Sequence, residues 1–294
     1  MSTEFLTTHE VADLLRIKLR KVYELASTHE IPSVKAKGKL LFPRQDILAW
    51  LQHGKQPTSA PTASNIPPAV LAGSYDPLLE WAIKASGCDL ALKLAGSQTG
   101  LDEFTAGRAQ ACGLHLAEPL SGGLEWNVRT VANQASLHNA VLVNWAWRNR
   151  GFVLAPGKRA SIRHAGQLKG MRLVRRPDGS GTQVLMDWLL QQNGLDQSDV
   201  HWSEVCHGET DAVACLTSGQ ADVALSLQAM AGQYGLEFIA CLKERFDLLV
   251  NRKAWFDPHF QKLWAFTQGE FFVQKSRQLQ GYDLTQKGQV IWNA

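Results

Sequence analysis

Residues 171–190 read MRLVRRPDGSGTQVLMDWLL. Residues 171–174, in which three of four side chains are apolar, predict a short buried strand, and the apolar run from Val184 predicts a helix. Between them, the GSGT segment at 179–182 combines glycines, which let the backbone approach a ligand, with two hydroxyl donors and the free N–H groups of a helix N-terminus. The order of strand, Gly/Ser turn and helix predicts an anion seat. A capped tight turn without a ligand would give the same pattern.

Two further Gly-Ser turns stand in the same kind of context. Gly73-Ser74 follows a predicted strand at 70–72, and Gly96-Ser97 follows a predicted strand at 90–95. More strands are predicted at 111–116 and 140–145, with helices between strands, so we expect an α/β domain with a mainly parallel sheet. Ligands of such sheets bind at the carboxyl ends of strands, where all three turns would converge on one oxyanion.

The composition fits a globular protein of more than one module. The chain has 294 residues, of which 45% are hydrophobic and 19% charged. No apolar run approaches the roughly 18 residues of a membrane span, and the N-terminus MSTE lacks the layout of a signal peptide. We therefore expect a cytoplasmic protein without a membrane partner.

No catalytic constellation is visible. The sequence contains no G-x-S-x-G, no Walker phosphate loop and no H-E-x-x-H motif. The five cysteines are widely spaced without a C-x-x-C pair, which favours buried small side chains over a disulfide framework or a zinc site. His115 is expected to be a core histidine. The prediction is a protein that is not an enzyme, with no catalytic residue, cofactor or metal cation.

The N-terminal segment predicts a small DNA-binding module. Thr7 and Glu10 form a capping-box pattern ahead of a first helix, and a second helix is expected over 18–27. Residues 33–42 alternate apolar and basic side chains around a glycine, which predicts a hairpin with a lysine face, and a third helix follows. Between Arg16 and Arg44 there are eight basic and two acidic residues, an excess of +6 that suggests a partner with phosphates.

The stretches LTTHEVADLL at 6–15 and KGKLLFPRQDILAWL at 37–51 resemble the winged helix-turn-helix of the excisionase and MerR-like group. The resemblance implies that the second helix enters the major groove of double-stranded DNA and that the wing contacts its backbone or minor groove. A solvated basic face on a protein-binding module is the alternative. Carried to this sequence, the groove-side candidates are Lys18, Arg20, Lys21 and Tyr23, and the phosphate contacts are Lys35, Lys37, Lys39 and Arg44.

A proline-rich stretch separates this module from the rest. Residues 54–68 read GKQPTSAPTASNIPP, with four prolines and no periodicity. Such a composition is typical of a flexible linker. The expected organisation is a DNA-binding domain at 1–54, a linker at 55–68 and a ligand-binding domain at 69–294.

The C-terminal part resembles a type II periplasmic-binding-protein fold, in particular the PBP-like domain of cytoplasmic regulators that is also attached to some molybdopterin-biosynthesis proteins. The likeness lies in GSYDPLLEWA, LAGSQTGLDEFTAGRAQACGLHL, RNRGFVLAPGK, MRLVRRPDGSGTQVLMDWLL and ADVALSLQAMAGQYGLEFIACLKERFDLLV, in that order. It implies two lobes with a ligand between them, lobe one from about 69–149 plus 242–294 and lobe two from about 151–241.

The resemblance also implies a set of ligand-binding residues. Strand alternation directs one of Arg175 and Arg176 inward, and Arg176, nearer the turn, is our choice. Where molybdate-binding relatives place a tyrosine, this chain has Leu227. The implied site comprises Ser74, Tyr75, Ser97, Gln98 and Thr99 from lobe one, and Arg176, Ser180, Gly181, Thr182, Thr210 and Leu227 from lobe two.

Together these features predict a ligand-responsive transcriptional regulator. The expected effector is a small oxyanion, molybdate or tungstate first and a small organic acid next, and DNA recognition by a single wing implies a homodimer or higher homo-oligomer. An alternative is a PBP-like enzyme or accessory protein of molybdopterin metabolism.

Overall fold

The computed structural model divides into two compact units, residues 1–64 and 65–294. It describes residues 5–27, 31–36, 39–53, 66–120, 123–134, 137–158 and 162–294. Most of the predicted linker, and Lys37 in the predicted wing, lie outside the described residues. None of the described helices is long and apolar enough to cross a bilayer.

The N-terminal unit contains the predicted helix-turn-helix and hairpin. Helix α1 begins with the expected capping box, in which Thr7 and Glu10 exchange hydrogen bonds. Val11, Val22, Phe42 and Ile47 meet in its small core. A short strand ahead of α1 was not predicted, and it pairs antiparallel with the hairpin. The elements are β1 (Phe5–Thr7), α1 (Thr8–Leu15), α2 (Leu19–Ser27), β2 (Val34–Ala36), β3 (Lys39–Pro43) and α3 (Arg44–His53).

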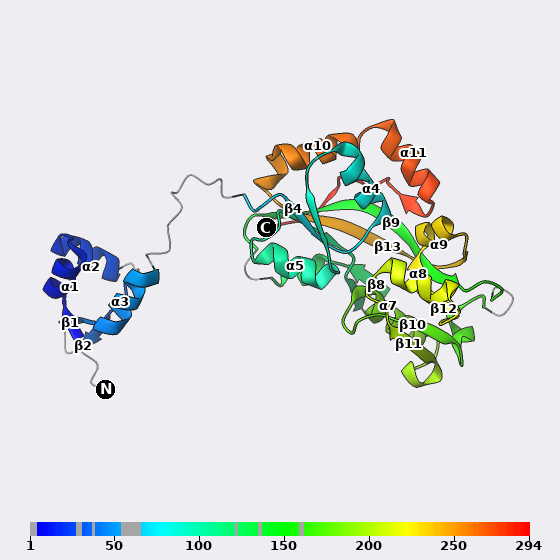
Figure 1. Ribbon diagram of the computed structural model, residues 1–294, viewed down its shortest axis with the longest axis horizontal. Coiled ribbons are helices and arrows are strands. Elements are labelled where there is room, and N and C mark those ends of the chain that lie inside the picture. Colours follow the sequence, from blue (N-terminus) through cyan, green and yellow to red (C-terminus); the bar gives the residue numbers. More distant parts are fainter. Residues whose placement is uncertain are drawn as a thin grey trace. The chain divides into compact units, whose positions relative to one another are not determined.

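The C-terminal unit is an α/β structure of two lobes (Figure 1). Its first half comprises β4 (Val70–Gly73), α4 (Pro77–Ser86), β5 (Ala91–Leu94), α5 (Ser97–Thr105), β6 (Ala111–Leu114), β7 (Ala117–Leu120), β8 (Gly123–Trp126), α6 (Val128–Ala132) and β9 (Ala140–Leu154). Its second half comprises β10 (Arg172–Arg175), α7 (Gly181–Gln192), β11 (His201–Val205), α8 (Glu209–Thr217), β12 (Val223–Leu227), α9 (Gln228–Tyr234), β13 (Glu237–Asn251), α10 (Pro258–Phe266), α11 (Glu270–Leu279), β14 (Tyr282–Asp283) and β15 (Val290–Asn293).

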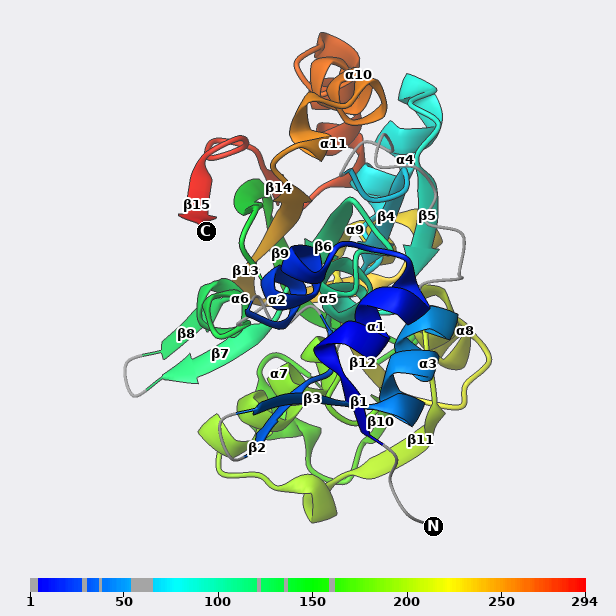
Figure 2. The ribbon, with the colours of Figure 1, turned by 90° about the vertical axis from the view of Figure 1, so that its left-hand side faces the viewer.

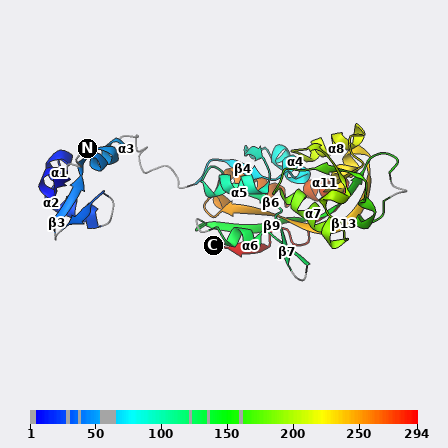
Figure 3. The ribbon, with the colours of Figure 1, turned by 90° about the horizontal axis from the view of Figure 1, so that it is seen from below.

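One mixed sheet runs through both lobes, in the order β11-β10-β12-β9-β13-β6-β4-β5, with β14 and β15 on β9. Within each lobe the predicted parallel pairs occur: β4 pairs with β5 and β6, and β10 pairs with β11 and β12. The prediction of a mainly parallel sheet is wrong at its centre, because β9 and β13 run antiparallel to each other and to their neighbours. A separate hairpin of β7 and β8 projects from this unit (Figures 2 and 3).

The long strands β9 and β13 connect the lobes. Residues 150–154 of β9 pair with β12 in lobe two, whereas residues 247–250 of β13 pair with β6 in lobe one. The middle of both strands therefore spans the boundary between the lobes. Only part of this was expected, because the strand predicted at 140–145 extends to residue 154.

Alternation along the strands builds a core on each face of the sheet in lobe one. Leu248 and Val250 pack with α4, α10 and α11, whereas Leu249 between them packs with α5 and α6. In Figure 1, α4, α10 and α11 lie above β9 and β13, and α5 lies below them. Lobe two repeats the arrangement, with α7 packed on one face and α8 on the other. The helix N-termini that follow β4, β5 and β10 are thereby held at the boundary between the lobes.

Candidate functional site

Two serines meet at the carboxyl ends of the strands of lobe one. Ser74 follows β4 and Ser97 is the first residue of α5, and their Oγ atoms lie 2.8 Å apart in a buried position. The backbone N–H of His115, just after β6, donates to Ser97 Oγ at 3.0 Å. Gly73 makes this convergence possible, because its φ is +113° and a Cβ there would lie 2.3 Å from the carbonyl oxygen of Gly113.

The Gly/Ser turn of lobe two lies against His115, the residue that donates to Ser97. Ser180 caps α7 by accepting from the N–H of Gln183. A Cβ on Gly181 would lie 3.0 Å from the carbonyl oxygen of His115, so the start of α7 touches lobe one. Thr182 is buried, and its hydroxyl oxygen accepts a hydrogen bond from Arg150 on β9. The structure therefore brings Ser74, Ser97, Gly181 and Thr182 to the boundary between the lobes.

Six charged side chains fill the centre of that boundary, and we name them the interlobe ion cluster. Arg148 lies 2.9 Å from Asp76 and also contacts Glu244, its cross-strand neighbour on β13. Arg150 lies 3.3 Å from Glu244. The members are Arg148, Arg150 and Arg176, and Asp76, Glu209 and Glu244.

Glu209, at the start of α8, closes the cluster on the side of lobe two. Its carboxylate lies 3.1 Å from Nη2 of Arg150 and 3.7 Å from Nη1 of Arg176, and it accepts a hydrogen bond from Ser226. The side chain of Arg176 is 11% exposed. Three guanidinium groups thus face three carboxylates, which makes the formal charge of the cluster zero.

The pKa values follow from burial and from these ion pairs. Burial opposes ionisation of Glu244, but Arg148 and Arg150 outweigh it and hold the pKa of Glu244 well below its ordinary value. Burial likewise opposes ionisation of Glu209, whose pKa is nevertheless lowered by Arg150 and Arg176. Burial lowers the pKa of His115, against the opposing pull of Glu244 at 3.4 Å. At neutral pH Glu209 and Glu244 are therefore charged and the imidazole of His115 is neutral.

Several donors in the cluster have no hydrogen-bond partner among the described residues. They are Nε of Arg148, Nε of Arg150, and Nε and Nη1 of Arg176. Leaving a buried donor unpaired costs about 1 to 3 kcal/mol, so such atoms mark places where a further acceptor is favourable. The hydroxyls of Ser74, Ser97 and Thr182 lie at the same boundary between the lobes, and hydroxyl and guanidinium groups are donors of the kind that bind anions. One acceptor of the cluster, Oε2 of Glu244, is also without a hydrogen-bond partner among the described residues.

Other residues of the sequence-based set differ in their surroundings. The side chains of Gln98, Thr99 and Thr210 are exposed, and Leu227 is buried in an apolar cluster with Val213 and Met230. Arg175 turns away from the cluster to Asp178 and the ring of Trp202, whereas its neighbour Arg176 turns toward Glu209.

Tyr75 lines a separate pocket. Its volume is about 420 Å³, and helices α4, α9 and α11 form its walls. Burial, with Glu80 beside it, raises the pKa of Tyr75 above its ordinary value. The phenol is therefore neutral at physiological pH.

Most of the ion cluster could not be found from the sequence. Arg148 and Arg150 lie in the stretch RNRGF, and Glu244 follows 96 residues after Arg148. The spacing of Arg148 and Arg150 was the one available signal, because two charged residues two positions apart in a buried strand lie on the same face of the sheet. Among the described residues no group of three or more His, Cys, Asp or Glu side chains is arranged to hold a metal ion.

The N-terminal unit carries the basic candidates on its surface. Lys18 is exposed just before α2, and Arg20 and Tyr23 are exposed on α2, Tyr23 to 52%. Lys21 is exposed and pairs with Glu24 at 2.7 Å. Lys39 is exposed at the start of β3, and Arg44 is exposed at the start of α3. The side chain of Lys35 and the whole of Lys37 lie outside the described residues.

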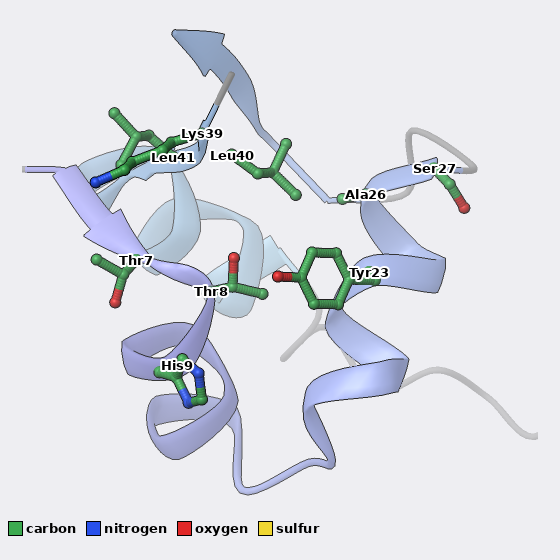
Figure 4. A pocket seen from close by; sticks show the side chains of 9 residues that line it. All are labelled: Thr7, Thr8, His9, Tyr23, Ala26, Ser27, Lys39, Leu40 and Leu41. Atoms are coloured by element: carbon green, nitrogen blue, oxygen red, sulfur yellow. The ribbon is translucent and has the colours of Figure 1, made fainter. Parts of the chain in front are cut away.

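A pocket of about 550 Å³ lies between α1, α2 and β3 in this unit. Figure 4 shows that the Tyr23 hydroxyl points toward Thr8 at the start of α1, with Lys39 on the strand opposite. A hydroxyl and an ammonium group are donors of the kind that bind phosphate oxygens, so Tyr23 and Lys39 stay candidate phosphate contacts. The N-terminus of α1 is not one of these donors, because the Glu10 carboxylate already accepts from Thr7 there.

Two family models match the two parts of the chain, and one known protein is similar over nearly its whole length. Residues 5–55 match the family described as helix-turn-helix domain, and residues 80–268 match the family described as PBP superfamily domain. The uncharacterized protein YvgK of Bacillus subtilis (strain 168) is 25% identical over 309 residues, which cover 98% of this chain and 98% of YvgK.

Solved structures resemble the C-terminal unit at low sequence identity. A glycosylated variant of PEB3 has a TM-score of 0.50 at 14% identity, covering 73% of this chain and 98% of that one. PhnD1 of Prochlorococcus marinus, solved with methylphosphonate, has a TM-score of 0.49 at 10% identity and covers 73% of this chain and 90% of its own. The fold class is that of type II periplasmic binding proteins, as predicted. The chain belongs to the PBP superfamily domain family and carries a helix-turn-helix domain at its N-terminus.

Proposed function

We propose that the protein is a ligand-responsive transcriptional regulator that binds double-stranded DNA through its N-terminal unit. The proposal rests on one observation above all: a helix-turn-helix domain with exposed basic side chains is joined in one chain to a two-lobed domain whose lobes meet at buried hydroxyl and guanidinium groups. Neither of these domains is a catalytic one by its family description, and this supports a sensor in preference to an enzyme. DNA binding would place the protein in the cytoplasm.

The domain boundaries of this proposal are those expected from the sequence, with DNA binding in residues 1–54, a linker at 55–68 and ligand binding in residues 69–294. In the excisionase and MerR-like arrangement, each module contributes a recognition helix and a wing. One such module contacts few phosphates, so binding by a homodimer or higher homo-oligomer on a palindromic or repeated site is part of the proposal.

The proposed ligand is a small oxyanion between the lobes, with molybdate or tungstate as the first choice. The hydroxyls of Ser74, Ser97 and Thr182 and the N-termini of α5 and α7 supply the donors. Tetrahedral oxyanions are well recognised by such hydroxyl and amide groups. By binding the closed arrangement of the lobes better than the open one, the ligand would shift the equilibrium between two DNA-binding states.

A small organic acid is the second candidate, and the arginines favour it. Arg148, Arg150 and Arg176 all reach the boundary between the lobes. Guanidinium groups match carboxylates bidentately, which a site made only of hydroxyls and amides does not do.

DNA binding is tested by an electrophoretic shift on genomic fragments upstream of the protein's own gene. Deletion of residues 1–54 should abolish a salt-sensitive shift and leave ligand binding intact. Arg20→Ala should weaken the shift, whereas Lys169→Ala, an exposed cation of the other unit, should not. A shift that survives the deletion would contradict the proposal.

Ligand class is tested by thermal unfolding with molybdate, tungstate, sulfate, phosphate and a set of small carboxylates. A ligand at a hundred times its Kd adds about 2.7 kcal/mol to stability, which is readily measured. A response to carboxylates alone would select the second candidate. A response to neither class would exclude an anion sensor.

A further inference from the structure

Glu209 occupies a position that an external anion would otherwise take. Its carboxylate is held by Arg150 at 3.1 Å, by Arg176 at 3.7 Å and by the hydroxyl of Ser226. Arg150 donates from the same Nη2 atom to Thr182. Two guanidinium groups and a hydroxyl around one carboxylate are the donor set with which proteins bind a free carboxylate or oxyanion. The group that fills this set belongs to the protein itself.

The seat around Glu209 is not fully used by that side chain. Nε of Arg150, whose side chain is 1% exposed, and Nε and Nη1 of Arg176 have no hydrogen-bond partner among the described residues. A free anion with more acceptor oxygens, whose position is not fixed by a connection to the backbone, would accept hydrogen bonds from more of these donors. The two arginines therefore favour an external anion over Glu209 in hydrogen bonding.

Charge balance prevents the two from sharing the seat. With Glu209 in place the interlobe ion cluster is formally neutral, so an added anion would find no uncompensated cation there. It would instead meet the Glu209 carboxylate at the same two guanidinium groups, where like charges repel strongly because water is excluded.

The position of Glu209 in the chain allows it to leave. It is the first residue of α8, and the neighbouring side chains of His207 and Thr210 are exposed. A local movement of this turn is therefore enough to carry the carboxylate into water. The carbonyl of His207 accepts a hydrogen bond from Arg176, so the segment after β10 and the turn before α8 are in contact beside Glu209.

We propose that Glu209 is an internal ligand at the boundary between the lobes and that an anionic ligand binds by exchange with its carboxylate. This inference rests on the proposed anion-sensing function and adds its specificity-determining residue. The external group is one with two or more anionic oxygens, either a carboxylate or an inorganic oxyanion. Glu209 thereby sets a threshold of affinity: an anion that binds Arg150 and Arg176 no better than the Glu209 carboxylate does not displace it.

The test compares the full-length protein with Glu209→Gln and Glu209→Ala, using Glu204→Gln as the matched control because Glu204 is an exposed glutamate on the neighbouring strand β11. Molybdate, phosphate, formate and acetate are titrated into each protein in chloride-free buffer by calorimetry, and thermal midpoints are recorded in parallel. Molybdate and phosphate report on inorganic oxyanions, and formate and acetate on carboxylates.

Exchange predicts three results. Glu209→Gln binds at least one probe about tenfold more tightly than the wild type, since the competing charge is gone while the side-chain volume is kept. Glu209→Ala has a lower thermal midpoint without anions, and formate or acetate restores it more than it stabilises the wild type. Glu204→Gln behaves as the wild type in both measurements.

Equal or weaker probe binding by Glu209→Gln would overturn the proposal, because Glu209 would then assist the ligand. Equal stabilisation of all proteins would place the anion outside the seat and overturn it as well, and so would no response from any of them. Failure of the sensing function is distinguishable. In that case the variants gain anion binding as described, while wild-type DNA binding is unaffected by every probe.

Discussion

Replacing Glu244 by glutamine should strongly destabilise the C-terminal unit. Glu244 is fully buried on β13 and contacts Arg148, Arg150 and the imidazole of His115. Glutamine keeps the size of the side chain and removes its charge. Two buried guanidinium groups thereby lose a counter-ion in a place that water does not reach.

The expected size follows from the remaining partners. Removing one member of a buried ion pair costs about 3 to 5 kcal/mol. Here Arg148 keeps Asp76 and Arg150 keeps Glu209, which argues for the lower end of that range. For a unit of this length each kcal/mol lowers Tm by about 2 to 4 °C, so we expect a decrease of about 6 to 12 °C.

The assay is differential scanning calorimetry of the full chain at pH 7, with Glu125→Gln as control. Glu125 is an exposed glutamate on β8, and its replacement should change stability by no more than about 0.5 kcal/mol. The pH dependence provides a second check. Because the pKa of Glu244 is lowered in the folded state, its stabilising effect is present above its ordinary value of 4.5 and is lost as the pH falls below it.

The wild type and the variant should therefore converge in acid. A decrease in Tm of less than about 2 °C at pH 7 would refute the reasoning, since it would mean that the buried arginines do not need this counter-ion. A difference that persists unchanged at pH 3 would refute the assignment of the effect to its charge.

Three further predictions concern single residues. Burial lowers the pKa of His115, so stability should fall as the pH drops below 6.5, and His115→Gln should flatten the dependence of Tm on pH below 6.5. Gly181→Ala places a Cβ 3.0 Å from the His115 carbonyl, so α7 should be held away from lobe one and the affinity for the ligand should fall several-fold in a titration. Burial and the neighbouring Cys215 raise the pKa of Cys206 to about 11, so iodoacetamide at pH 8 should label it slowly until urea unfolds the protein, as mass spectrometry would show.

Local patterns in the sequence predicted the elements that depend on nearby residues. The capping box of Thr7 and Glu10 begins α1 as expected, because both partners lie within one helical turn. The Gly/Ser turns before α5 and α7 were located for the same reason, since a strand, a turn and a helix start are read within about ten residues. In α5 the helix begins at Ser97 itself, so this serine belongs both to the turn and to the helix N-terminus.

Long-range pairing was beyond the reach of these patterns. Strand β1 forms because it pairs with β3. In this pairing Leu6 lies opposite Phe42, which is more than thirty residues away in the sequence. The central strands β9 and β13 run antiparallel and turn a parallel sheet into a mixed one. A strand's length and direction in a sheet depend on its neighbours, which the sequence of that strand does not contain.

The sequence by itself therefore determined the two domains' classes and the hydroxyl half of the candidate site, Ser74, Ser97 and Thr182. Of its charged half the sequence indicated Arg176 alone, and only the tertiary structure decided the rest. A buried arginine is stable where carboxylates from other strands and helices surround it, and Asp76, Glu209 and Glu244 reach Arg148 and Arg150 from elements far apart in the chain. Burial and pairing of charge are properties of the packed sheet, and for that reason no local motif announces them.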